Sequence, residues 1–205
     1  PYIAGAVQSV AALQAVPASA LKAELNAKLA SGDALLGLAW QEQLGQMEPV
    51  SIETLATRSG GNVKLRGCKR WVVPGSGADG WLVSANGQDG PALYYVPAGA
   101  SGLRVEDHAR VDGSFAADLY LEVEVPAANR LASGPAAREP LERALASAQF
   151  VQGAELLVIA RQAFFFHESS RVSKLNLPRM DGFERLYWTT LIVILVITLW
   201  PGLRA

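Results

Sequence analysis

The chain has 205 residues, of which 50% are hydrophobic and 18% charged, with a formal net charge of −1 and one cysteine. This length suits one domain or two small ones, and the composition supports a packed core, which excludes a globally disordered protein. The near-neutral charge excludes the basic excess of nucleic-acid-binding proteins, and the lone Cys68 cannot form an internal disulfide. No His and Cys residues have metal-ligand spacing, so we expect no metal site. With a single cysteine, we expect a reducing, cytoplasmic location.

Residues 1–33 predict an N-terminal helical segment in two parts, joined at Pro17. Alanine is frequent in this segment and β-branched residues are rare. The second part has apolar residues at helical spacing, which are Leu21, Leu25 and Leu29. Ser19 is expected near its start and Gly32 is expected to end it.

Residues 34–133 predict a β-sheet domain. The apolar run 34–40 is interpreted as a buried strand. Seven more strand-like runs follow, separated by turns rich in Gly, Pro and Asn: 52–58, 62–66, 69–73, 80–85, 92–96, 103–108 and 119–125. Such closely spaced strands indicate an antiparallel barrel or sandwich, and Pro126 is expected to end the sheet. The predicted fold class is therefore α+β, with this barrel or sandwich between an N-terminal helical segment and a long C-terminal helix.

Residues 136–176 predict that long helix, because apolar residues recur near the helical period. A later run, 186–203, contains no charged residue, and Trp188 and Trp200 lie near its ends. At ~1.5 Å per residue it is long enough to cross a ~30 Å hydrocarbon core. Three interpretations stay open for this run: a membrane anchor, a buried helix of a bundle, or the product of a shifted reading frame after about residue 176.

Residues 64–73 carry the most distinctive motif. We interpret this stretch as two short strands joined at Gly67, the second carrying Trp71 among β-branched residues. The motif Gly67-x-Lys69-x-Trp71 is preceded by the sequence Leu-Ala-Trp-Gln-Glu at 38–42. Glu42, Thr54 and Pro126 stand in register with it. This ordered set resembles the middle β-domain of the acyl-CoA dehydrogenases, and the helix after it resembles the first long helix of their C-terminal bundle.

The resemblance covers roughly residues 20–173, so we expect the chain to be truncated at both ends relative to that family. It implies a flavoprotein oxidoreductase of fatty acid metabolism that binds FAD between the β-domain and the helical bundle. The implied reaction is α,β-dehydrogenation of an acyl-CoA thioester. The implied partners are the acyl-CoA substrate, an electron-transfer flavoprotein if the protein is active, and further copies of the chain through the helical part.

The resemblance also implies site residues. Trp71 takes the position of the aromatic residue beside the flavin, and Trp40 and Gln41 end the family's first flavin-contacting strand. Val73 stands where the family has a Thr or Ser, so a hydroxyl contact to the flavin is lost. Gln41 stands where the family has a flavin-binding Thr, and its amide can still donate and accept hydrogen bonds.

On the substrate side, the resemblance implies Met47 and Glu48, which replace a Ser and an Asp of the family. No catalytic residue is assigned, because the family's glutamate base lies in later helices. We therefore expect a partial or degenerate member with weak or no activity. The alternative is a non-catalytic β-domain binding module, tethered to a membrane by residues 186–203.

Other residues have simpler interpretations. Trp71 could be an ordinary core indole, and His108 and His167 are isolated and expected to be structural or solvated. Cys68 is expected to be a small filler. The three phenylalanines at 164–166 are expected in a core or a contact between subunits.

Overall fold

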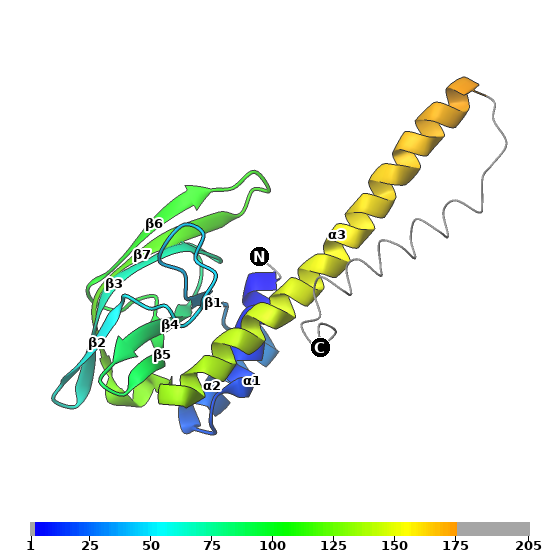
Figure 1. The fold of residues 1–205 in the computed structure, drawn as a ribbon. Coiled ribbons are helices and arrows are strands. Elements are labelled where there is room, and N and C mark those ends of the chain that lie inside the picture. Colours follow the sequence, from blue (N-terminus) through cyan, green and yellow to red (C-terminus); the bar gives the residue numbers. More distant parts are fainter. Residues whose placement is uncertain (1–2, 176–205) are drawn as a thin grey trace. The chain divides into compact units, whose positions relative to one another are not determined.

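The computed structural model describes the backbone of residues 3–175 and the side chains of residues 3–165. The chain divides into two units, Pro1–Ala148 and Gln149–Ala205. The helical elements are η1 Ile3–Gln8, α1 Ser9–Ala15, α2 Ala20–Ser31, η2 Ala127–Asn129, η3 Gly134–Ala137 and α3 Arg138–Leu175. The strands are β1 Leu36–Ala39, β2 Leu55–Ser59, β3 Asn62–Val72, β4 Gly80–Gly87, β5 Gly90–Pro97, β6 Leu103–Ala109, β7 Phe115–Pro126 and β8 Arg130–Ser133 (Figure 1).

The N-terminal helices form as predicted, on either side of Pro17. In α2, the Ser19 hydroxyl accepts a hydrogen bond from the backbone N–H of Lys22 at 3.1 Å, which caps the first turn. Gly32 ends the helix in the left-handed region, with φ 80°, where a residue without Cβ is favoured. The first segment differs from an ordinary α-helix in one respect, because it begins with the π-helical turn η1.

The strands form one eight-stranded mixed sheet in the order β6-β7-β3-β2-β4-β5-β8, with β1 pairing parallel to β4. The α+β class is confirmed, but the prediction of an antiparallel barrel is wrong. Strands β1 and β2 pair parallel to β4, and the edge strands β6 and β8 do not pair with each other, so the sheet does not close. The spacing of strands along a sequence is the same in open and closed sheets. Charged, exposed side chains along β6 are typical of an edge strand.

Two further predictions are corrected within the sheet. The stretch 64–73 is not two strands, because β3 runs without interruption through Gly67 and pairs with both β2 and β7. Pro126 does end β7, as its missing N–H requires, but the sheet continues. After η2, the short strand β8 returns to pair with β5.

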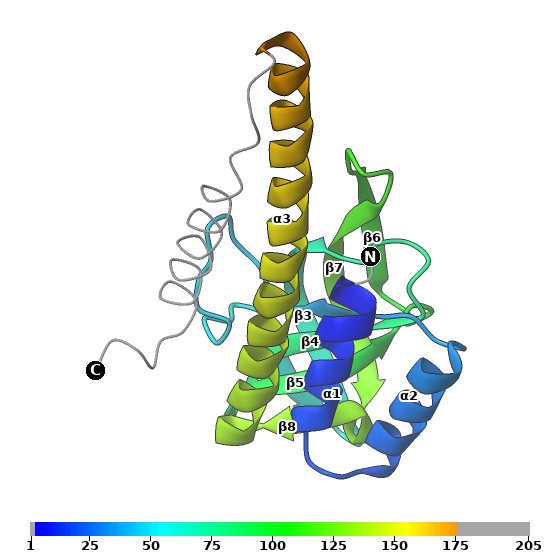
Figure 2. The same cartoon turned by 90° about the vertical axis from the view of Figure 1, so that its right-hand side faces the viewer.

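Two clusters of apolar side chains make up the core. One lies on one face of the sheet and includes Val63, Leu65, Trp81, Leu119 and Val123. The second joins α1, α2 and the start of α3 to the other face of β1, β4 and β5, through Leu13, Leu25, Leu36, Leu82, Leu93 and Leu141. Figure 2 shows α1 and α2 together over this face. Strand β4 is therefore buried on both sides.

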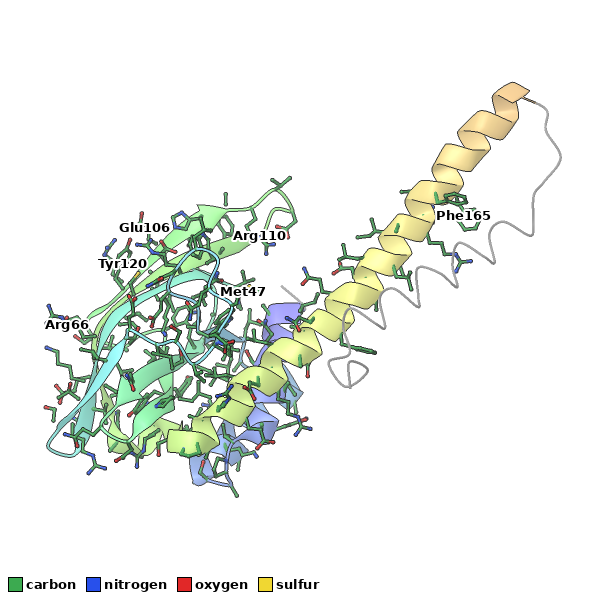
Figure 3. All side chains as sticks on the ribbon, viewed as in Figure 1. Met47, Arg66, Glu106, Arg110, Tyr120 and Phe165 are labelled. Atoms are coloured by element: carbon green, nitrogen blue, oxygen red, sulfur yellow. The ribbon has the colours of Figure 1, made fainter. Side chains whose placement is uncertain are left out.

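The predicted long helix is confirmed as α3, whose part from residue 149 onward belongs to the second unit. In that part, the Phe164 and Phe165 rings meet edge to face at 6.5 Å, and the Arg161 guanidinium lies 5.5 Å from the Phe165 ring (Figure 3). Across residues 3–175, no helix combines the length and apolarity that crossing a membrane requires. The run 186–203 lies outside the described residues.

Candidate functional site

A charged network lies inside the sheet, where the alternation of β3 would place an apolar residue. Lys69 Nζ lies 2.5 Å from Glu42 Oε1, and the two side chains are 0% and 5% exposed. The ammonium also donates to Ser84 Oγ on β4 at 2.8 Å. A buried charge requires such partners, because desolvation of an unpaired ion is costly.

Glu42 also accepts hydrogen bonds from the two residues that precede β2. It accepts hydrogen bonds from Thr54 N at 3.0 Å, from Thr54 Oγ1 at 2.6 Å and from Glu53 N at 2.5 Å. Lys69 reaches back to the carbonyl oxygen of Trp40 at 3.5 Å. The network therefore joins the segment after β1 to β3, to β4 and to the residues before β2. Because both carboxylate oxygens of Glu42 already accept hydrogen bonds, we interpret Glu42 as a structural carboxylate.

Burial and pairing act in opposite directions on these two groups. Burial lowers the pKa of Lys69 to about 8, although the charge of Glu42 acts to raise it. For Glu42, burial acts to raise the pKa, but the Lys69 charge and the hydrogen bonds from Lys69 and Thr54 outweigh it and keep the pKa below its ordinary value. At neutral pH the two groups therefore form an ion pair.

Trp71 lies on a β-bulge close to this network. Strand β3 pairs with β7 up to Lys69 and again from Val72, so two residues of β3 face one residue of β7. Trp71 has φ 51°, the only positive φ of a non-glycine residue in the described part of the chain. Its side chain is 42% exposed, so the interpretation of Trp71 as a buried core indole is wrong.

The segment after β1 contacts this bulge directly. The backbone N–H of Arg70 donates to the carbonyl oxygen of Gln41 at 2.8 Å. Trp40 and Gln41 are both half-buried, and the Gln41 amide donates to Gln43 O at 3.4 Å. The structure therefore brings Trp40 and Gln41 next to the bulge that carries Trp71.

Val73 follows the bulge and is half-buried. The next residue, Pro74, accepts a hydrogen bond from Trp81 Nε1 at 3.1 Å, which ties this end of β3 to the core. Gly75 N donates to Phe115 O at 3.1 Å, at the start of β7. Val73 thus has a well-supported backbone and an apolar side chain that offers no hydrogen bond.

Met47 and Glu48 lie on the loop between β1 and β2, and Met47 is 86% exposed (Figure 3). The side chain of Gln46 forms hydrogen bonds to the backbone at both ends of this loop. Its Oε1 accepts from Glu42 N at 2.8 Å and its Nε2 donates to Ser51 O at 2.8 Å. Among the described residues, no hydrogen bond or ion pair joins Met47 or Glu48 to the bulge, so their role on the substrate side stays a prediction.

Asp118 is a residue of this site that the sequence did not indicate. It is the residue of β7 opposite the bulge, and its Oδ1 accepts a hydrogen bond from Trp71 N at 3.1 Å. In the sequence it is simply one acidic residue between Ala117 and Leu119 in a strand. Asp118 belongs to the site only because it lies opposite the bulge, and no pattern in the sequence marks the position of that bulge.

Other features of the described residues do not coincide with this site. A shallow pocket lies where the β4–β5 turn meets β2 and β8, and it includes Arg58, Asp89, Tyr94 and Arg130 but none of the predicted site residues. Within residues 3–165, no group of three His, Cys, Asp or Glu side chains could hold a metal ion.

No protein-family model matches the chain, and no curated protein matches it. Solved structures do match. A glutaryl-CoA dehydrogenase from Mycobacterium smegmatis has a TM-score of 0.71 at 26% identity, over 91% of this chain and 50% of that chain. A glutaryl-CoA dehydrogenase from the same organism in complex with FADH2 has a TM-score of 0.62 at 29% identity, over 70% and 39% of the two chains.

The chain is similar to acyl-CoA dehydrogenases. The resemblance inferred from the motifs is thereby confirmed. A glutaryl-CoA dehydrogenase in complex with glutaryl-CoA, at 20% identity and a TM-score of 0.60, adds a likeness of fold over 75% of this chain and 45% of that one. The chain spans half or less of the length of these acyl-CoA dehydrogenases.

Proposed function

We propose that this chain forms the β-domain and first bundle helix of an FAD-dependent oxidoreductase that introduces an α,β double bond into an acyl-CoA thioester. Its likeness to glutaryl-CoA dehydrogenases, one of them in complex with FADH2, supports the proposal. One observation supports a flavin site most directly. Trp71 presents a partly exposed indole from a bulge whose backbone is held by two hydrogen bonds, one to Asp118 and one from Arg70 to Gln41.

The residues around the bulge fit one wall of a flavin site. An exposed indole offers a flat aromatic face on which an isoalloxazine ring can stack. The Gln41 amide offers a donor and an acceptor, and Val73 offers apolar contact only. Bound FAD would supply the redox chemistry, as the acceptor of the substrate's β-hydride.

The residues of this chain would bind and orient the acyl-CoA substrate. The loop that carries Met47 and Glu48 would face the acyl-CoA, with the flexible thioether of Met47 against apolar parts of the substrate. Phe165 and the apolar residues of α3 would contribute to contacts between copies of the chain. The electron acceptor would be an electron-transfer flavoprotein, and the location cytoplasmic.

No base is proposed from the described residues. Glu42 is occupied by Lys69 and by backbone donors, and Asp118 is occupied by Arg70 and Trp71. With Val73 in place of a hydroxyl-bearing residue as well, we propose weak or no turnover by this chain alone. The membrane-tethered alternative depends on residues 186–203, so nothing in residues 3–175 favours it.

The test is whether the purified protein takes up FAD. Equilibrium dialysis should show saturable binding, with a flavin absorbance band that shifts on transfer from water to the protein. A dye-coupled assay with glutaryl-CoA and butyryl-CoA should then show little or no turnover. A protein that binds no FAD at any soluble concentration would retain the fold but not this function.

A further inference from the structure

The backbone of Trp71 is held in a conformation that such a residue rarely adopts. At φ 51° its Cβ is close to its own backbone, so holding a non-glycine residue there costs conformational free energy. The bulge opposes Arg70 and Trp71 to one residue of β7, Asp118. Some contact at the bulge must offset that cost, since the chain could otherwise relax into regular pairing.

Asp118 provides this contact through both carboxylate oxygens. Oδ1 accepts from Trp71 N at 3.1 Å, and Oδ2 accepts from Arg70 Nη1 at 2.7 Å. The carboxylate is 7% exposed, although its neighbours along the same face of β7, Tyr120 and Glu122, are half-buried or exposed. A carboxylate this buried, with one oxygen for each bulge residue, is well suited to fix the bulge.

Other charged groups surround Asp118 from the edge strand. His108 Nε2 lies 3.5 Å from Oδ2, and Glu106 is the register partner of Asp118 on β6. Arg104 pairs with Glu106 at 3.0 Å and stacks on the Tyr120 ring at 3.7 Å. The Asp118 carboxylate therefore lies between the Arg70 guanidinium and the His108 ring.

We propose that Asp118 is a positioning residue, which orients the Trp71 indole by holding the bulge in its left-handed conformation. Its relevance to flavin binding rests on the function proposed above. Asparagine could not replace it, because an amide has one acceptor oxygen for two donors. Its NH2 group would then face either the Arg70 guanidinium or the Trp71 N–H.

The experiment follows the Trp71 indole directly. Protein labelled with 5-fluorotryptophan would be studied by 19F NMR, with the Trp71 resonance assigned by Trp71→Phe. In Asp118→Asn, that resonance should shift and broaden, while Glu122→Gln should leave it unchanged. Glu122 is the matched control, since it is an ion-paired carboxylate on the same face of β7 but is 56% exposed.

A second variant covers the case in which Asp118→Asn does not fold. Arg70→Gln removes the other partner of the same carboxylate from a side chain that is 41% exposed, and should shift the Trp71 resonance by a smaller amount. An unchanged Trp71 resonance in the folded variants would overturn the proposal.

FAD affinity separates this proposal from the proposed function. If wild-type protein binds FAD, Asp118→Asn should bind it about tenfold more weakly, which corresponds to ~1.4 kcal/mol. If wild-type protein binds none, the proposed function fails, while a shifted Trp71 resonance still supports the positioning role. Equal FAD affinity in Asp118→Asn and wild type would overturn that role.

Discussion

Lys69 and Glu42 form an ion pair inside the sheet, with Nζ and Oε1 2.5 Å apart and both side chains almost fully removed from solvent. Lys69 lies three residues before the end of β3, and Glu42 follows β1 by three residues. The pair therefore fixes the segment of Trp40 and Gln41 against the strand that carries Trp71. The geometry of the candidate flavin wall therefore depends on this charge pair.

Breaking this pair should be strongly destabilising. Lys69→Met leaves the Glu42 carboxylate buried without a counter-charge, which costs about 3–5 kcal/mol of unfolding free energy. The double variant Lys69→Met, Glu42→Gln should cost less than the sum of the two single changes. Urea denaturation measures these differences. Glu122→Gln, which removes an exposed partner of Lys64, should change the unfolding free energy far less, because solvent screens that pair. Equal effects at both sites would contradict the account.

The pH dependence of stability should show the lowered pKa of Lys69. The pKa of Lys69 is about 8 in the folded protein and 10.5 for an unburied lysine, as in the unfolded chain. Between these two pH values the unfolded chain therefore binds more protons than the folded protein. The unfolding free energy should therefore rise with pH in this window. Measured by urea denaturation from pH 7.5 to 9.5, wild type should gain on the order of 2 kcal/mol relative to the Lys69→Met, Glu42→Gln double variant. Parallel curves would show that Lys69 does not titrate there.

Gly67 should not tolerate a side chain, because Thr54, the residue before β2, lies too close. A Cβ at this position would lie 2.5 Å from Thr54 Oγ1 and 2.8 Å from Thr54 Cα, in the residue that donates to Glu42. Gly67→Ala should therefore cost about 1–3 kcal/mol. Gly61→Ala is the matched control, since nothing lies within 4 Å of its Cβ and its φ is not left-handed. Thermal denaturation of both variants checks this, and similar melting temperatures would contradict it.

Much of the local structure follows from the sequence. The caps of α2 were readable because Ser19 and Gly32 act through local backbone geometry. Lys69 could have been recognised as buried, since it continues the inward phase of Val63 and Leu65 along β3. That signal competes with the general rule that a lysine side chain is exposed.

The remaining features depend on long-range pairing. The open sheet and the strand β8 are set by which edges meet, and strand spacing does not encode this. The bulge at Trp71 changes the phase of alternation between Lys69 and Val72, which are both buried although three positions apart. A pattern with period two cannot anticipate that change, so Asp118 had no visible role in the sequence.

Val73 offers a gain-of-function test. If the lost hydroxyl weakens contact with the flavin, Val73→Thr should restore about 1 kcal/mol, which is about a fivefold increase in FAD affinity. Val105→Thr, at another half-buried position in the sheet, should leave FAD affinity unchanged. Fluorescence titration with FAD measures both. An equal effect of the two changes would indicate that position 73 does not contact the flavin.

The most direct measurement of the central claim is FAD affinity with and without the Trp71 indole. Titration of wild type, Trp71→Ala and Leu55→Ala with FAD, followed by quenching of flavin fluorescence, separates the indole from general effects on the sheet, since Leu55 is an exposed residue of β2. Loss of a stacked aromatic face should weaken binding about tenfold in Trp71→Ala alone. Undiminished FAD binding in a folded Trp71→Ala protein would contradict the assignment of this bulge to a flavin site.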